Sequence, residues 1–166
     1  MRVFITVGST KFDLLVQAVL SLPVIDALRQ KGYNDIIVQC GNSQVDGLES
    51  EFERHGATVT VWRFKPSLEE EYAAADLVIS HAGSGTILDV LRKPKPLIVV
   101  PNPTLLDNHQ EELAHALSAL GHLKASTVAD LARAVLDLDI STLVPFPAFD
   151  GTRFRELLDE EMGFKQ

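Results

Sequence analysis

Short apolar runs alternate along this chain with segments in which apolar residues recur every three or four positions. That order is typical of strands and helices that follow one another, and it favours a parallel sheet covered by helices on both faces. The runs are rich in Val and Ile and do not alternate with polar residues, which indicates strands buried on both faces. We therefore predict an α/β fold with a Rossmann-like parallel sheet. Its expected strands are Val3–Val7, Asp35–Gln39, Thr58–Trp62, Leu77–Ser80 and Leu97–Val100, with a short sixth strand at Gly121–Lys124.

Helices are expected between these strands. Pro23 lies inside the first of them, and because proline lacks an amide donor we expect that helix to kink or split there. A helix starting at Asp46 or Ser50 and ending near His55 is expected before the third strand. The other expected helices are Phe12–Lys31, Leu68–Ala75, Ser84–Leu91, Asn108–Leu120 and Thr127–Leu136, the last with Thr127 as its N-cap.

Two parts are expected along the chain. Residues 1–136 form the Rossmann-like domain, and residues 137–166 form a connector with Pro145 and Pro147, followed by a last helix at Thr152–Met162. The apolar stripe of that helix is a candidate docking surface for a partner, and the alternative is that it packs on its own sheet. The stripe consists of Phe154, Leu157, Leu158 and Met162.

The composition excludes several classes of protein. The net charge of −8 argues against nucleic-acid binding, which favours basic patches, and gives no general attraction to an anionic membrane surface. Cys40 is the single cysteine, so no internal disulfide forms, which suits a reducing compartment. No apolar run approaches the roughly 20 residues that span a bilayer, and no signal-peptide pattern precedes the first strand. We expect a cytoplasmic chain whose membrane attachment, if any, comes from a partner.

Two glycine-containing turns follow expected strands. Gly8, Ser9 and Thr10 come after the first strand, where a glycine lets the backbone approach a ligand closely. The run from Gly83 to Thr86, Gly-Ser-Gly-Thr, opens a helix, and the free amides of a helix N-terminus favour an anion such as phosphate. The alternative for both is an ordinary tight turn. A dinucleotide fingerprint would need a third glycine at Leu88 and a place after the first strand, so NAD binding is disfavoured.

Two further groups of polar residues adjoin these turns. Asp89 lies one helical turn after Gly85 and Thr86, where a carboxylate is placed to bind ribose hydroxyls, although a solvated aspartate is the alternative. Asn108, His109 and Gln110 open the next helix, where they are candidates to bind a sugar, with helix capping as the alternative for Asn108. We expect His81 to be a structural histidine with satisfied hydrogen bonds. The remaining histidines show no metal-ligand spacing, and we predict no metal site.

At these motifs the chain resembles the catalytic, donor-binding subunits of two-part UDP-N-acetylglucosamine transferases of the dolichol pathway. More widely it is similar to the C-terminal halves of GT-B glycosyltransferases of family 28. The resemblance covers most of the chain and is carried by Val3–Thr10, Ala75–Thr86, Asn108–Ala114 and Gly121–Leu123.

The resemblance implies an inverting transfer of N-acetylglucosamine from UDP-GlcNAc to dolichyl-diphosphate-GlcNAc, the second sugar step of N-glycan precursor assembly. It implies that the turns at Gly8–Thr10 and Gly83–Thr86 face the diphosphate, that Arg63 and Phe64 lie near the uracil, and that Asp89 binds the ribose. Asn108, His109 and Gln110 would face the donor sugar. Most relatives carry glutamate at the position of Asp89, one methylene longer.

The resemblance also implies a partner. A GT-B enzyme closes two Rossmann-like domains over its substrates, and this chain is long enough for one, so we expect a membrane-anchored subunit to supply the acceptor domain at the cytosolic face of the endoplasmic reticulum. No cofactor or metal is expected, and the general base is not identifiable in this chain. The alternatives are the donor-binding subunit of a two-component bacterial exopolysaccharide transferase, and a nucleotide-binding regulator without turnover.

Overall fold

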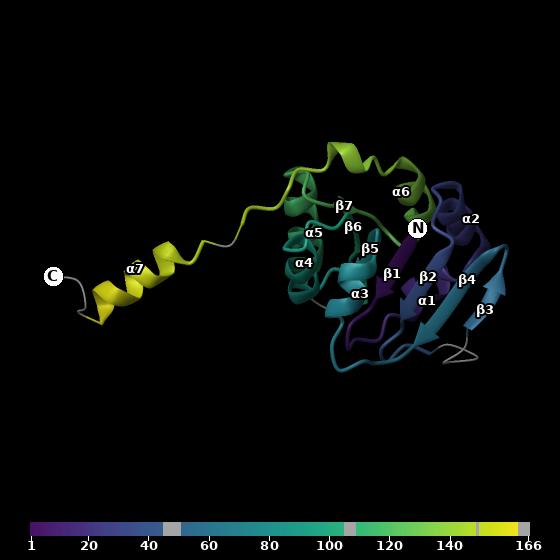
Figure 1. Ribbon diagram of the computed structural model, residues 1–166, viewed down its shortest axis with the longest axis horizontal. Helices are drawn as coiled ribbons and strands as arrows, with labels where there is room; N and C mark the ends of the chain where they lie inside the picture. The colour runs from purple at the N-terminus through teal and green to yellow at the C-terminus, as the bar shows by residue number, and fades with distance from the viewer. Residues whose placement is uncertain (45–50, 105–108, 149, 163–166) are drawn as a thin grey trace.

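The computed structural model describes residues 1–44, 51–104, 109–148 and 150–162 (Figure 1). The described residues form one seven-stranded sheet in the order β3-β4-β2-β1-β5-β6-β7, parallel except for the edge strand β3, which pairs antiparallel with β4. The expected α/β fold is confirmed. The strands are β1 (Arg2–Thr6), β2 (Asp35–Gln39), β3 (Glu51–Arg54), β4 (Ala57–Trp62), β5 (Leu77–His81), β6 (Leu97–Val100) and β7 (Lys124–Ala125).

Helices cover both faces of this sheet (Figure 1). One face packs against α1, α2 and α6 through a cluster that includes Val3 and Ile5 of β1, and the other packs against α3, α4 and α5 through a cluster that includes Phe4. Successive residues of β1 therefore point to opposite helical layers, as side chains of a strand buried on both faces must. The helices are α1 (Asp13–Val19), α2 (Leu22–Gln30), α3 (Glu69–Ala74), α4 (Ser84–Leu91), α5 (His109–Ala119), α6 (Leu131–Asp137) and α7 (Thr152–Glu161), with a 3₁₀ turn, η1, at Ile140–Thr142.

The expected break near Pro23 is confirmed. The first helix ends at Val19, and α2 begins at Leu22 with Pro23 in its first turn, where a missing amide donor costs no helical hydrogen bond. Strands β1, β2, β4, β5 and β6 and helix α4 also lie where they are predicted.

The helix expected to end near His55 is wrong over the described residues, because Glu51–Arg54 is strand β3. His55 and Gly56 both have positive φ, 51° and 76°, and together they make a two-residue turn that folds β3 back onto β4. Phe52 of β3 then packs against the core. The expected helix start at Asp46 or Ser50 lies outside the described residues.

Two further boundaries differ from the prediction. The sixth predicted strand is β7 at Lys124–Ala125, because Gly121 has a φ of 77° and makes a turn rather than a strand. Helix α6 begins at Leu131, so Thr127 is not its N-cap; the Thr127 hydroxyl instead donates to the Asp130 carboxylate at 2.8 Å.

The connector after α6 is held to the body, whereas α7 stands apart from it (Figure 1). The Val144 amide donates to the Gly121 carbonyl at 2.9 Å, and the His122 ring packs edge-on against Phe146. Leu158 of α7 remains 45% exposed, and Figure 1 shows no packing of this helix on the sheet. None of the helices within the described ranges has the length and apolar character needed to span a bilayer.

Candidate functional site

The predicted site residues gather where the chain changes direction across the sheet. From β1 the chain continues to β2 on one side, and from β4 it crosses to β5 on the other side of β1. The segments that leave β1 and β5 then turn to helices on opposite faces of the sheet. In open parallel sheets a crevice forms at the carboxyl ends of such a strand pair, and ligands bind there.

The loop after β1 holds Gly8, Ser9 and Thr10. Gly8 has a φ of 62°, the left-handed conformation that glycine adopts without strain. Its amide donates to Oε1 of Gln39 at 2.9 Å, and the Thr10 hydroxyl donates to the Val7 carbonyl at 2.7 Å. Among the described residues the Ser9 amide and hydroxyl have no hydrogen-bond partner, so Ser9 is the member of this loop whose donors are open to a ligand.

The carbonyl oxygens of this loop all face the neighbouring strand and its loop. The Gly8 carbonyl accepts from Gln39 Nε2 at 2.8 Å, the Ser9 carbonyl from Asn42 Nδ2 at 2.7 Å, and the Thr10 carbonyl from the Asn42 amide at 3.1 Å. Carbonyl oxygens repel an anion, so turning them toward residues 39–42 leaves the opposite side of the loop suitable for a phosphate.

Helix α4 begins directly after β5 and has no side-chain cap at Gly83. The amides of Ser84, Gly85 and Thr86 are in its first turn, where no intrahelical acceptor exists for them, and Ser84 and Gly85 are exposed. A Cβ added to Gly85 would meet nothing within 4 Å. This helix start therefore presents donors and the positive end of the helix dipole at the crevice.

His81, the last residue of β5, packs against both glycine turns, at Gly8 and at Gly83. An added Cβ would lie 2.9 Å from its ring at Gly8 and 2.4 Å from it at Gly83, so both turns approach the same imidazole. Nδ1 is buried and has no close hydrogen-bond partner among the described residues, although the backbone of Thr6 lies near enough to act on the titration of the ring. Burial lowers the pKa of His81, because the uncharged ring is favoured away from water.

Asp89 is exposed on α4, one turn after Gly85 and Thr86. Behind it lies the buried ring of Tyr72 from α3. Burial raises the pKa of Tyr72, the adjacent Thr86 side chain opposes that rise, and the negative charge of Asp89 adds to it. The phenol therefore stays neutral, and Asp89 is exposed to solvent.

Arg63 and Phe64, the residues predicted to lie near the uracil ring, follow β4. The Arg63 guanidinium donates to the Gly41 carbonyl at 3.2 Å, and the Arg63 carbonyl accepts from Gln39 Nε2 at 2.6 Å. Arg63 is thus tied to the same strand that holds the Gly8 loop. Phe64 is 54% exposed, an apolar ring open to solvent at the carboxyl edge of the sheet.

The start of α5 is tied to the end of β6. Gln110 Oε1 accepts from the Asn102 amide at 3.1 Å, which leaves the Gln110 amide nitrogen free to donate to a ligand. Asn102 also donates from Nδ2 to the Lys11 carbonyl at 3.4 Å, so it connects this segment to the loop after β1. His109 is exposed, and Asn108 lies outside the described residues.

Sequence reasoning missed Gln39 and Asn102, the two buried residues that connect the loops of the site. Each lies at or just beyond the carboxyl end of a buried strand, Gln39 as the last residue of β2 and Asn102 two residues after β6. A polar residue at that position is the signal that was available, because the carboxyl ends of parallel strands share one edge.

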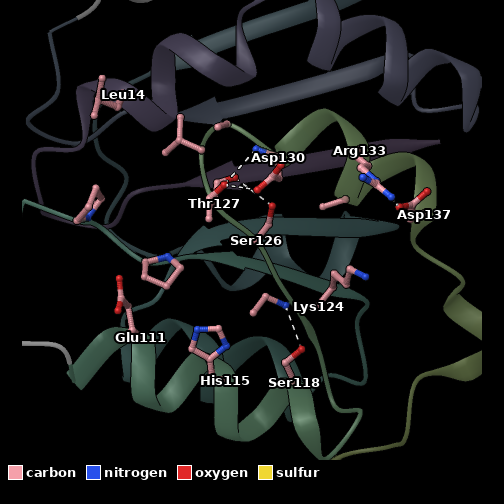
Figure 2. Close-up of a pocket in the computed structure, with 16 residues that line it drawn as sticks. Leu14, Glu111, His115, Ser118, Lys124, Ser126, Thr127, Asp130, Arg133 and Asp137 are labelled. Atoms are coloured by element: carbon pink, nitrogen blue, oxygen red, sulfur yellow. Dashed lines mark hydrogen bonds and ion pairs between the residues drawn. The ribbon is translucent and has the colours of Figure 1, made fainter.

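A pocket of about 790 Å³ adjoins the segment of Asn102 and Gln110, with Pro101, Pro103 and Glu111 in its wall, and extends between α5, β7 and the segment that leads into α6 (Figure 2). Its polar groups are largely bonded to one another: Thr127 to Asp130, Arg133 to Asp137, and the Ser118 hydroxyl to the Ala125 amide. No group of three or more His, Cys, Asp or Glu residues with metal-site geometry occurs in the part of the chain that the structure describes.

Comparison with known proteins identifies relatives. The family model for the glycosyltransferase family 28 C-terminal domain matches residues 2–159. The UDP-N-acetylglucosamine transferase subunit ALG13 of Eremothecium gossypii is 38% identical over 189 aligned positions, which cover 95% of this chain and 91% of the relative. The mouse protein of the same name is 46% identical over 122 residues, but this chain spans only about 10% of its length.

A solved structure has the same fold. The NMR solution structure of ALG13 superimposes with a TM-score of 0.71 at 28% identity, over 95% of this chain and 94% of that one.

Proposed function

The chain belongs to glycosyltransferase family 28 as its C-terminal domain, and on that premise we propose that it is the donor-binding, catalytic subunit of a UDP-N-acetylglucosamine transferase. The proposed reaction moves N-acetylglucosamine from UDP-GlcNAc to dolichyl-diphosphate-GlcNAc. The name of the Eremothecium gossypii relative, which this chain matches over nearly its whole length, supports this donor and this transfer. The same name disfavours an exopolysaccharide transferase.

The observation that carries the proposal is the uncapped start of α4 beside the Gly8 loop, at the strand pair where the sheet changes direction. Free amides at Ser84, Gly85 and Thr86 would bind the diphosphate from one side, and the Ser9 donors would bind it from the other. Because the carbonyl oxygens of the Gly8 loop are turned away, nothing in that loop opposes the negative charge.

The remaining residues are assigned to the two ends of the donor. Asp89 would accept hydrogen bonds from the ribose hydroxyls, and the exposed ring of Phe64 would stack on the uracil, with Arg63 holding that loop in place. Gln110 would donate to the sugar from its free amide nitrogen, next to His109. The role proposed for Asn108 at the sugar rests on its sequence position alone.

The proposed mechanism is a single displacement that inverts the anomeric carbon. Negative charge develops on UDP as it leaves, and the dipole and amides of α4 stabilise that charge without a metal ion. We assign the general base to the partner, which would also present the acceptor hydroxyl. His81 is buried beside the diphosphate position and is not assigned this role.

The acceptor half of the enzyme is assigned to a separate, membrane-anchored subunit at the cytosolic face of the endoplasmic reticulum. The word "subunit" in the relatives' name supports a partner. The projecting helix α7, with Leu158 and Met162 exposed, is the surface that we assign to it. A nucleotide-binding regulator without turnover would keep the same donor site, so a transfer assay separates the two functions.

Gly85 offers a direct test of the nucleotide site. Gly85→Asp should weaken UDP binding by about 10- to 100-fold in calorimetric titration, because it adds a negative charge beside the diphosphate. The fold should not suffer, since the position is open and an acidic residue in the first turn of a helix is favourable. Gly85→Asn is the matched control for size without charge and should bind UDP more tightly than Gly85→Asp. Normal UDP binding by Gly85→Asp would show that the site is assigned wrongly.

A further inference from the structure

Gln39 is 2% exposed, and its amide uses all of its hydrogen-bonding capacity. Oε1 accepts from the Thr6 hydroxyl at 2.5 Å and from the Gly8 amide at 2.9 Å. Nε2 donates to the Gly8 carbonyl at 2.8 Å and to the Arg63 carbonyl at 2.6 Å. One side chain therefore holds both polar groups of Gly8 and also reaches the loop after β4.

The partners fix the orientation of this amide. A flipped amide would set its oxygen against the carbonyl oxygens of Gly8 and Arg63, and its nitrogen against the Gly8 amide. Since both contacts would be repulsive, only one orientation is stable. A buried amide with every bond satisfied rigidifies the segments that it joins.

The loops after β1, β2 and β4 make further contacts with one another. Arg63 reaches from the β4 loop to the Gly41 carbonyl, and Asn42 holds the carbonyl oxygens of Ser9 and Thr10. A Cβ at Gly41 would lie 2.5 Å from the Gly8 carbonyl oxygen, so the loop after β2 is in close contact with the loop after β1. Among the described residues of this network, Gln39 is the one whose side chain hydrogen-bonds to both Gly8 and Arg63.

We propose that Gln39 is a positioning residue that sets the diphosphate-binding loop at Gly8 and the uracil-binding loop at Arg63 in one common geometry. This inference rests on the proposed function, because it assigns the two loops to the two ends of UDP. It differs from a role in folding, since it ties the affinity for two separate fragments of the nucleotide to one buried amide. Gln39 itself touches no ligand in this account.

The test compares Gln39→Met with the wild-type full-length chain. Methionine fills a similar volume but makes none of the four hydrogen bonds, so the Gly8 amide should exchange its hydrogen faster in the ligand-free protein. NMR titration should show UDP affinity reduced by about 10- to 100-fold. Affinity for uridine and affinity for pyrophosphate should each fall, because both loops lose the same anchor.

Two further variants complete the design. Thr6→Val removes one partner of Gln39 and also the second acceptor of the Gly8 amide, at 3.1 Å. The losses of UDP affinity in Thr6→Val and Gln39→Met should therefore not add in the double variant, because both changes act on one network. Val135→Ala is the control for general destabilisation: this buried residue of α6 packs in the core on the face of α1 and α2, and its loss should leave UDP affinity unchanged.

The outcomes distinguish failure of the positioning role of Gln39 from failure of the proposed function. Wild-type UDP affinity in Gln39→Met, or a loss limited to one of the two fragments, would overturn the positioning role while leaving the proposed function intact. A loss no larger than that of Val135→Ala would overturn it as well. Failure of the wild-type chain itself to bind UDP would instead contradict the proposed function.

Discussion

His81 is a buried imidazole in contact with both glycine turns of the site. Its uncharged form is favoured because burial lowers its pKa below the ordinary value of 6.5. A neutral ring packs between the two turns and adds no charge beside them. The size of this ring also explains why positions 8 and 83 hold glycine, since any Cβ there would collide with it.

This burial predicts a pH dependence of stability. Below pH 6.5 the unfolded chain protonates His81 while the folded chain does not, so acidification favours unfolding. The free energy of unfolding should therefore fall between pH 7.5 and 5.5, with a contribution from His81 of at most about 1.4 kcal/mol per pH unit. The fall should stop once the pH drops below the folded pKa. Urea denaturation at several pH values measures it.

His81→Gln is the comparison that isolates this residue, because glutamine does not titrate. Its stability should depend less on pH over the same range than that of the wild type. Asp139 and Asp150, whose pKa values are lowered by hydrogen bonds to Ser141 and Thr152, titrate below this range in both proteins. Identical pH profiles for the two proteins would refute the buried, neutral His81.

At the scale of single residues, the sequence predicts those residues whose role depends on their immediate neighbours in the chain. Glycine and hydroxyl residues at the turn before Ser84–Leu91 indicate an anion-binding helix start because the signal lies within a few neighbouring positions. Gln39 carries no comparable signal: its partners Gly8 and Arg63 lie 31 and 24 residues away, and only the strand order brings them together.

At the scale of elements the positions of the main strands along the chain follow from the hydrophobic pattern, with one exception at the edge of the sheet. Residues 51–54 contain one apolar residue, Phe52, and precede the two-residue His55-Gly56 turn, which is a hairpin signal rather than a helix signal. A four-residue segment is too short for periodicity to decide between helix and strand, so the contact with β4 decides it.

Helix α7 makes an element-scale prediction. Removing the residues after Ala148 should change the free energy of unfolding by less than about 0.5 kcal/mol, because α7 stands apart from the sheet. The same truncation should abolish association with the membrane-anchored partner in a pull-down. Thermal and chemical denaturation measure the first effect.

The contrasting variant is Leu138→Ala. Leu138 is 8% exposed and belongs to the core cluster, so its truncation should cost about 2 kcal/mol or more. If loss of α7 destabilised the domain as much as Leu138→Ala does, α7 would have to be packed on the body, and its assignment as a free docking element would be wrong.

At the scale of the whole molecule the described residues form one Rossmann-like sheet, and the turns after β1 and β5 meet at its carboxyl edge. In the proposed function the donor binds at this edge, and the α4 amides, the Gly8 loop and Asp89 all come from one chain. The described residues form a single sheet, and under the proposed function a separate subunit presents the acceptor.

The most direct measurement is transfer of labelled N-acetylglucosamine from UDP-GlcNAc to dolichyl-diphosphate-GlcNAc, by this chain alone and together with its membrane-anchored partner. Transfer is expected only when both are present, and it should fall about tenfold or more at non-saturating UDP-GlcNAc when the chain in the complex carries Gly85→Asp. Efficient transfer by the isolated chain, or no transfer by the assembled pair, would contradict this expectation.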